Sequence, residues 1–253
     1  MSLYTTTSDY IKSVSTINVV LPVTIGFWGK YIGSPSNYSH LAFLGTPSVP
    51  YPDFYIGSAV AFYDTNDSAD PNGQQVNGTF SSDQWYYFLY RQLGLNEAYF
   101  TTLDPSTGTI LKVSDVSTNT GVGNAALGIG SGTNITRTST TPTRIAEFFF
   151  AFGIDLLPSG GAMDDVITQQ MAYRGPFSFP HFIPAIQEYY SFRTGPQGGP
   201  FNEVLGDVYF SENPAIGAAP LTWTTTGTVE AGEHPPLAVD YVRPVPQRGL
   251  LLI

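Results

Sequence analysis

Apolar residues along the chain fall into short runs of the kind that β-strands produce. Residues 17–31 form one such run, rich in β-branched and aromatic side chains, and this composition favours a buried strand. Pro22 lies inside the run and has no backbone N–H, so we expect this strand at a sheet edge or with a bulge. Residues 83–92 are apolar at both alternating sets of positions, which predicts a central strand buried on both faces or covered by a partner chain.

The same pattern predicts further strands and one helix. The strands cover residues 40–44, 54–64 (a strand pair), 97–103, 109–113, 126–129, 144–152 and 221–229. The Pro-Ser-Thr-Gly sequence at 105–108 is typical of a hairpin turn. The helix is expected at 161–174, where Asp164 and Asp165 complement the positive amino end of its dipole. Strands spaced by roughly 8–12 residues, with turn signals between them, predict an all-β sandwich or jelly roll.

Three segments are expected along the chain. Residues 1–16 form a short helix or an N-terminal arm, residues 17–174 the jelly-roll domain, and residues 175–253 an extension with a small sheet. The extension ends in an apolar tail, which is an aggregation liability unless something covers it. The tail either adds as a strand to a neighbouring subunit or folds back on its own sheet. The predicted assembly residues are Leu250, Leu251, Leu252 and Ile253.

Composition narrows the class of protein. Only 12% of the 253 residues are charged, against roughly 25% in ordinary soluble domains. The 16 Tyr and 17 Phe argue against disorder, and too few Glu, Lys and Arg are present to coat a helical bundle. The net charge of −10, with Lys and Arg scattered singly, argues against nucleic-acid binding.

Several kinds of site and location are excluded by missing sequence features. With no cysteine the chain has no disulfide, thiolate metal site or Cys nucleophile. No apolar run approaches the roughly 18–20 residues of a membrane helix. The first residues show neither the basic nor the apolar region of a signal peptide, so we expect no export by that route.

An ordered series of motifs resembles the concanavalin A-like, laminin-G-like jelly roll, in particular the versions in structural proteins of tailed phages. An apolar strand with Phe27 and Trp28 opens the series, and residues 83–88 match the central strand with its tryptophan. Leu103-Asp104 with the Thr107-Gly108 turn matches the family's hairpin. Residues 127–130 match its small-residue strand, and residues 144–150 its closing strand.

The resemblance implies both a fold and a function. The fold is a concanavalin A-like β-sandwich with a short helix and a proline-rich C-terminal β extension. The function is that of a non-enzymatic structural protein displayed on a tailed-phage virion, as a head decoration, minor capsid protein, or tail or fibre component. Its partners would be other virion proteins and copies of itself. Release by lysis would explain the missing export signal.

A loop rich in oxygen ligands is the one candidate metal site. Asp64, Asn66, Asp67 and Asp70 offer the hard ligands that Ca²⁺ prefers. The same residues are typical of a solvated turn, because they hydrogen-bond their own backbone. Both interpretations stay open, and no other cofactor is expected.

The sequence lacks the residue patterns of common catalytic sites. Retaining glycosidases of this superfamily need paired carboxylates about 5 Å apart. Glu147 stands alone among Phe and Ala and is expected as a rim residue that faces solvent or caps a turn. The three histidines lie beside turn or proline sequence, and the chain has no Gly-x-Ser-x-Gly elbow. We therefore expect no enzyme activity.

Aromatic residues supply the alternative function, a glycan-binding module that attaches to cell-surface carbohydrate, with or without calcium. The candidates for stacking against a sugar ring are Tyr51, Tyr55, Tyr189 and Tyr190. Trp85 is expected in the core instead.

Overall fold

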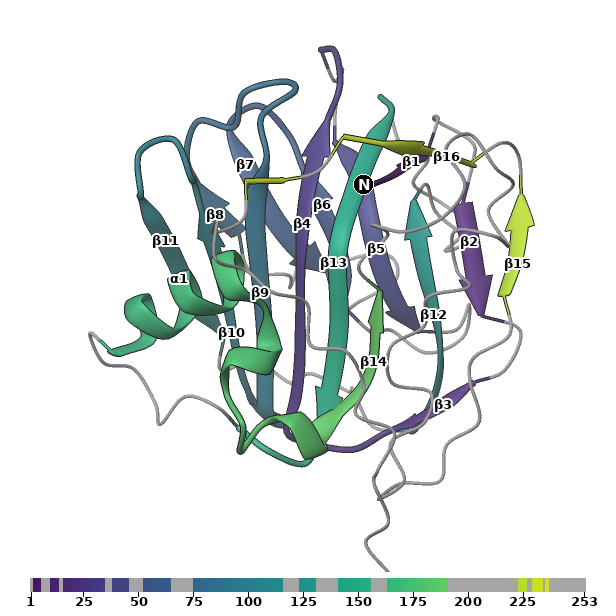
Figure 1. The fold of residues 1–253 in the computed structure, drawn as a ribbon, viewed down its shortest axis with the longest axis vertical. Coiled ribbons are helices and arrows are strands. Elements are labelled where there is room, and N and C mark those ends of the chain that lie inside the picture. Colours follow the sequence, from purple (N-terminus) through teal and green to yellow (C-terminus); the bar gives the residue numbers. More distant parts are fainter. Residues whose placement is uncertain are drawn as a thin grey trace, which may run out of the picture.

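A computed structural model describes twelve stretches of the chain, which form two antiparallel β-sheets and one α-helix (Figure 1). The described residues are 2–5, 10–13, 16–34, 38–45, 52–64, 75–115, 123–130, 141–155, 163–190, 223–226, 229–233 and 235–236. None of the helices within them is long and apolar enough to cross a membrane.

Sheet I has eight strands in the order β11-β10-β9-β4-β13-β1-β16, and β14 also pairs with β13. These strands are β1 (Ser2–Thr5), β4 (Val23–Tyr31), β9 (Tyr86–Gly94), β10 (Glu97–Leu103), β11 (Ile110–Asp115), β13 (Thr143–Phe152), β14 (Ile186–Tyr190) and β16 (Val229–Gly232).

Sheet II also has eight strands, in the order β15-β2-β12-β5-β6-β7-β8, and β3 pairs with β12. They are β2 (Tyr10–Ser13), β3 (Ile17–Val19), β5 (Ser39–Gly45), β6 (Asp53–Ile56), β7 (Val60–Asp64), β8 (Gln75–Asn77), β12 (Gly123–Gly130) and β15 (Trp223–Thr226). The predicted all-β sandwich with one short helix is thereby confirmed.

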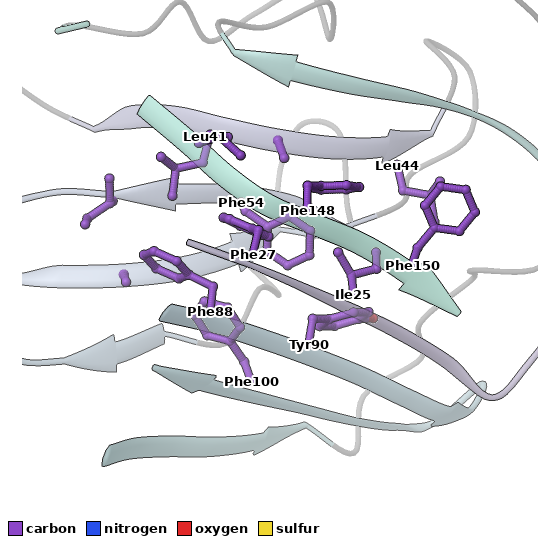
Figure 2. Packing of buried hydrophobic residues seen from close by; sticks show 14 of the residues in the cluster. Ile25, Phe27, Leu41, Leu44, Phe54, Phe88, Tyr90, Phe100, Phe148 and Phe150 are labelled. Atoms are coloured by element: carbon purple, nitrogen blue, oxygen red, sulfur yellow. The ribbon is translucent and has the colours of Figure 1, made fainter. Parts of the chain in front are cut away.

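The inner core lies between the two sheets and is built largely from aromatic rings. Phe27 of β4 stacks on Phe88 of β9 at 5.1 Å between ring centroids. It also meets Phe54 of sheet II edge-to-face at 5.3 Å (Figure 2). Such aromatic pairs add about 0.5–1.5 kcal/mol beyond the area they bury. The inner core therefore joins the centres of both sheets.

The outer face of sheet I carries a second core. Helix α1 (Met163–Arg174), the short 3-10 helix η2 (Ile183–Ala185) and Phe179, which follows the 3-10 helix η1 (Pro176–Ser178), contribute to it. The indole N–H of Trp28 donates to the Ala172 carbonyl of α1 at 2.9 Å, and Phe149 of β13 meets Phe182 edge-to-face. Sheet I is thus the middle of three layers.

Strand β9 shows why both cores exist. Tyr86, Phe88 and Tyr90 belong to the inner core, while Trp85, Tyr87 and Leu89 belong to the outer one. This is the alternation expected from the sequence, and Trp85 is buried as predicted. The second face is covered by the chain's own helix.

Glu147 departs from its predicted place at the rim. It is only 4% exposed and has a φ of 53°, in a β-bulge of β13 between Ala146 and Phe149. A bulge adds one residue to a strand, so the alternation of neighbouring side chains resumes after it. Ile145 and Phe148 consequently both face the inner core. The expectation of a solvent-facing Glu147 is wrong.

The chain ends and Pro22 also differ from expectation. Pro22 lies in the connection between β3 of sheet II and β4 of sheet I, and β4 is a central strand rather than an edge strand. Residues 1–16 supply β1 and β2 to the two main sheets instead of forming an arm. Strands β14, β15 and β16 likewise extend these sheets rather than building a small sheet of their own.

Gly26 in β4 gives a direct test of the outer core. A Cβ at this position would lie 2.4 Å from the Phe149 ring and 2.6 Å from the Tyr87 hydroxyl. We expect Gly26→Ala to lower the free energy of unfolding by about 1–3 kcal/mol through overpacking. The control is Gly94→Ala, because a Cβ there meets no atom within 4 Å. Urea denaturation measures both, and equal midpoints for the two variants would refute this packing.

Candidate functional site: a pocket at the open edge of the sandwich

A pocket of about 230 Å³ opens where the edge strands of the two sheets, β8 and β11, approach each other. Three of its lining residues are apolar or aromatic, Phe80, Tyr86 and Leu111, and we call them the floor. Four threonines and one acidic residue, Asp104, also line the pocket. The threonines are Thr79, Thr102, Thr107 and Thr109. The volume is below the roughly 300–1,000 Å³ of pockets for drug-sized ligands, so it suits a single ring.

Hydrogen bonds hold the floor in place. The Tyr86 ring meets Phe80 edge-to-face at 4.9 Å, and its hydroxyl oxygen accepts the Ser81 N–H at 2.6 Å. The Tyr31 hydroxyl of β4 donates to the Phe80 carbonyl at 2.5 Å. Burial raises the pKa of both Tyr31 and Tyr86 above 10.0. Both phenols are therefore neutral at physiological pH.

The carboxylate of Asp104 is oriented by its neighbours. Its Oδ1 accepts the side-chain amide of Gln84 at 2.6 Å and both the backbone N–H and hydroxyl of Ser106, at 2.8 and 2.7 Å. The turn closes where the Gly108 N–H donates to the Asp104 carbonyl at 2.8 Å. Gly108 has a φ of 72°, a conformation that favours glycine. Asp104 therefore presents a fixed acceptor to the pocket.

A buried lysine lies behind the pocket wall. Lys30 of β4 has a side chain only 1% exposed, and its ammonium contacts Asp83 Oδ1 at 2.6 Å and also Glu233. The ammonium lies 5.1 Å from the centre of the Trp85 ring, within the range of a cation–π interaction. Asp83 belongs to the same turn as Gln84, so Lys30 supports the segment that orients Asp104.

Other ionic groups of the described residues join structural elements. The Arg91 guanidinium binds both carboxylate oxygens of Asp155 at 2.7 and 2.8 Å, which ties β9 to the end of β13. Lys112 of β11 pairs with Asp165 of α1. Within the described ranges, no group of three His, Cys, Asp or Glu residues is placed to hold a metal ion.

The predicted calcium loop falls almost entirely outside the described residues. Asn66, Asp67 and Asp70 lie outside them, and of Asp64 only the backbone position, at the end of β7, is described. Asp64 is in register with Asp53 of β6. The calcium prediction stays a prediction. The assembly residues Leu250, Leu251, Leu252 and Ile253 also lie outside the described ranges.

Of the four predicted stacking tyrosines, Tyr55 is the one whose side chain lies in the described part of the structure. Tyr55 is 5% exposed, with its ring against His40 at 4.8 Å and its hydroxyl donating to Asp53 at 3.3 Å. This burial removes Tyr55 from any sugar-stacking surface. Tyr189 and Tyr190 lie in β14, where their backbone pairs with β13, and their side chains are not described. Tyr51 lies outside the described residues.

Sequence reasoning missed the pocket because its walls come from separate segments. Residues 78–86 supply one wall, while residues 102–111 supply the other. The local sequence pattern nearest to the pocket is the turn at 105–108, and it indicates a hairpin rather than a binding site. The two segments come together because β8 and β11 are the edge strands of opposed sheets.

Comparisons with known proteins bear on the fold. No protein-family model matches the sequence, and no curated protein is detectably similar to it in sequence. The structure is similar to the enzymatically active domain of tailspike protein 2 of bacteriophage CBA120, at 11% identity and a TM-score of 0.43. It is also similar to domains LG4-5 of the mouse laminin α1 chain (13%, 0.43) and to a heptameric SAP-like pentraxin of Limulus polyphemus (10%, 0.47).

The matched regions differ in extent. They cover 63%, 59% and 68% of this chain, and 25%, 40% and 82% of the tailspike, laminin and pentraxin chains, respectively. This chain thus spans less than half the length of the tailspike and laminin chains. At these identities the similarity concerns the fold alone.

The buried phenols predict a loss of stability in alkali. Above pH 10 an unfolded chain releases phenol protons that folded Tyr31 and Tyr86 retain, so rising pH favours unfolding. We expect the urea midpoint to fall between about pH 9 and about pH 11. The variant Tyr31→Phe lacks one of these phenols. Its urea midpoint should be lower than that of the unchanged protein at about pH 9, but should fall less by about pH 11. An equal loss in both proteins would contradict a raised pKa at Tyr31.

Proposed function

We propose that this protein is a non-enzymatic structural protein of a tailed-bacteriophage virion, displayed on the particle as a head decoration, minor capsid protein, or tail or fibre component. It would attach through its apolar C-terminal tail and meet copies of itself and other virion proteins there. The opposite edge of the sandwich would stay available for contact with the outside.

The observation that carries this proposal is the place of the first and last described strands relative to the pocket. β16 is the last strand of sheet I and pairs with β1, while β15 is the last strand of sheet II and pairs with β2. The pocket lies between β8 and β11, the edges at the other side of both sheets (Figure 1). One edge of the sandwich is therefore formed by the first and last described strands, and the pocket lies at the other edge.

The described charged groups support a structural role over a catalytic one. Lys30, Arg91 and Lys112 each bind carboxylates from elements far apart in the sequence. Lys30 and Arg91 are buried, so their charges act mainly to join strands and loops. A general acid or base would have to lie within hydrogen-bond reach of a reacting group, whereas these charged groups are paired with carboxylates of the protein.

A second candidate function, recognition of cell-surface glycan, is favoured by the chemistry of the pocket. A sugar ring has an apolar face and a rim of hydroxyls, and the lining of the pocket combines two aromatic residues with four threonines and one carboxylate. The fixed carboxylate of Asp104 accepts hydrogen bonds from hydroxyl groups and repels anions. We therefore propose a neutral sugar unit as the ligand. Display on a virion and glycan binding are compatible functions of one molecule.

The assembly proposal predicts the behaviour of a truncated chain. We expect the full-length protein to form a defined oligomer and a chain lacking residues 240–253 to be a folded monomer, as measured by light scattering and circular dichroism. The reason is that the apolar tail would bury its side chains on a neighbouring subunit. A full-length chain that is monomeric, and that unfolds on truncation, would place the tail on its own sheet and overturn the proposal.

The glycan proposal predicts a specific loss of binding. On an array of cell-surface glycans we expect binding to neutral sugars that Asp104→Ala weakens at least tenfold, because a polar ligand then loses a charged hydrogen-bond acceptor. Glu97→Ala at the far end of β10 is the control and should bind normally. Repeating the array with a chelator tests the calcium prediction separately. Binding that is unchanged in Asp104→Ala would remove the pocket as the glycan site.

A further inference from the structure

We infer that Glu233, at the C-terminal end of the described chain, is a positioning residue for the pocket and acts through Lys30. Glu233 directly follows β16, and with Pro235 and Pro236 it forms what we call the C-terminal strap. As a claim about ligand binding, the inference rests on the glycan function proposed above. As a claim about coupling between two parts of the molecule, it stands on the contacts of Lys30 alone.

The first step of the argument is the coordination of the Lys30 ammonium. An ammonium has three N–H donors and no acceptor. Three acceptors surround it in this structure: Asp83 Oδ1 at 2.6 Å, the Asp83 carbonyl at 3.4 Å, and Glu233 Oε1. The lysine side chain is only 1% exposed while these acceptors are in place. All three N–H donors of Lys30 therefore have an acceptor only while Glu233 of the strap contacts the ammonium.

The second step is the position of the strap. Figure 1 shows the described residues after β16 in front of the upper part of β4, on the side of sheet I that carries α1. The buried Pro235 holds it there, while the carboxylates of Asp83 and Glu233 remain 66% and 58% exposed. Lys30 and Glu233 are 203 residues apart in the sequence. Their ion pair is thus a direct link between the C-terminal segment and a central strand.

The third step leads from Lys30 to the pocket. Asp83 has a φ of 61°, which is unfavourable for a residue with a side chain and needs support from its surroundings. Its support comes from Lys30 and from its own N–H, which donates to the Tyr31 carbonyl at 2.8 Å. The next residue, Gln84, orients the Asp104 carboxylate. Release of Glu233 leaves Lys30 and Asp83 to readjust, and this loosens the turn that sets the pocket acceptor.

The consequence is a route by which attachment at the C-terminus tightens the pocket. Whatever holds the strap against β4 also completes the coordination of Lys30, fixes Asp83 and steadies the Gln84–Asp104 pair. A strap that is pulled away has the opposite effect. Binding at one edge of the sandwich and anchoring at the other are then coupled through a single buried cation.

Hydrogen–deuterium exchange with mass spectrometry tests this coupling on the full chain without any ligand. In Glu233→Ala we expect the amides of residues 80–86 to exchange about tenfold faster or more, since a buried donor has lost its partner. Glu233→Gln keeps an acceptor oxygen and should restore part of the protection. Residues 53–64 of sheet II should be unaffected, and Glu97→Gln is the matched control variant.

Two results would overturn the inference. The first is unchanged exchange of residues 80–86 in Glu233→Ala. The second is an equal acceleration in residues 53–64, which would mean that Glu233 stabilises the whole fold and not the turn. Neither result depends on a glycan, so a negative glycan array leaves this test intact, and a failed exchange test leaves the glycan proposal to be judged on Asp104.

Discussion

The structure depends on one constraint, the burial of sheet I on both faces. Strands β4, β9 and β13 place large apolar side chains on each side of the sheet, and each side chain that is fully buried contributes about 1.5–3 kcal/mol. Neither face can be left in water. Sheet II covers one face, and α1 with the two 3-10 helices covers much of the other. The aromatic pairs, the close approach at Gly26 and the bulge at Glu147 all follow from fitting three layers around these strands.

The same constraint explains where polar groups enter the interior. A charge inside a low-dielectric layer is tolerated only with partners that satisfy it. Lys30 and Arg91 both lie on central strands, and each reaches carboxylates in loops at the ends of the sheet. Each pair therefore fixes a loop that packing alone would leave loose. One of these loops, the turn at 81–84, also contributes Gln84, whose side chain donates to the Asp104 carboxylate at the pocket.

The sequence predicted the elements whose signals are local. The alternation along β9, the β10–β11 hairpin, the paired strands β6 and β7 and the helix α1 are all confirmed. It failed where pairing joins distant segments, because no local pattern reports a partner more than a hundred residues away. For this reason the prediction of a short helix or arm at 1–16 misses strands β1 and β2, and the prediction of an edge strand or a bulge at Pro22 misses the central place of β4. Glu147 was misplaced because its bulge is defined against β4, and the pocket was missed because two separate segments line it.

The two edges of the sandwich differ in how they are made. On the pocket side, β6-β7-β8 and β9-β10-β11 are neighbours in sequence as well as in space, so contacts close short loops. On the other side, β1 pairs with β16 and β2 with β15, which joins the first and last described strands. Closing such long loops costs more chain entropy than closing short ones. Lys30 binds both Asp83, from the turn before β9, and Glu233, which lies 203 residues away in the sequence, so one buried cation joins a locally connected segment to a distant one.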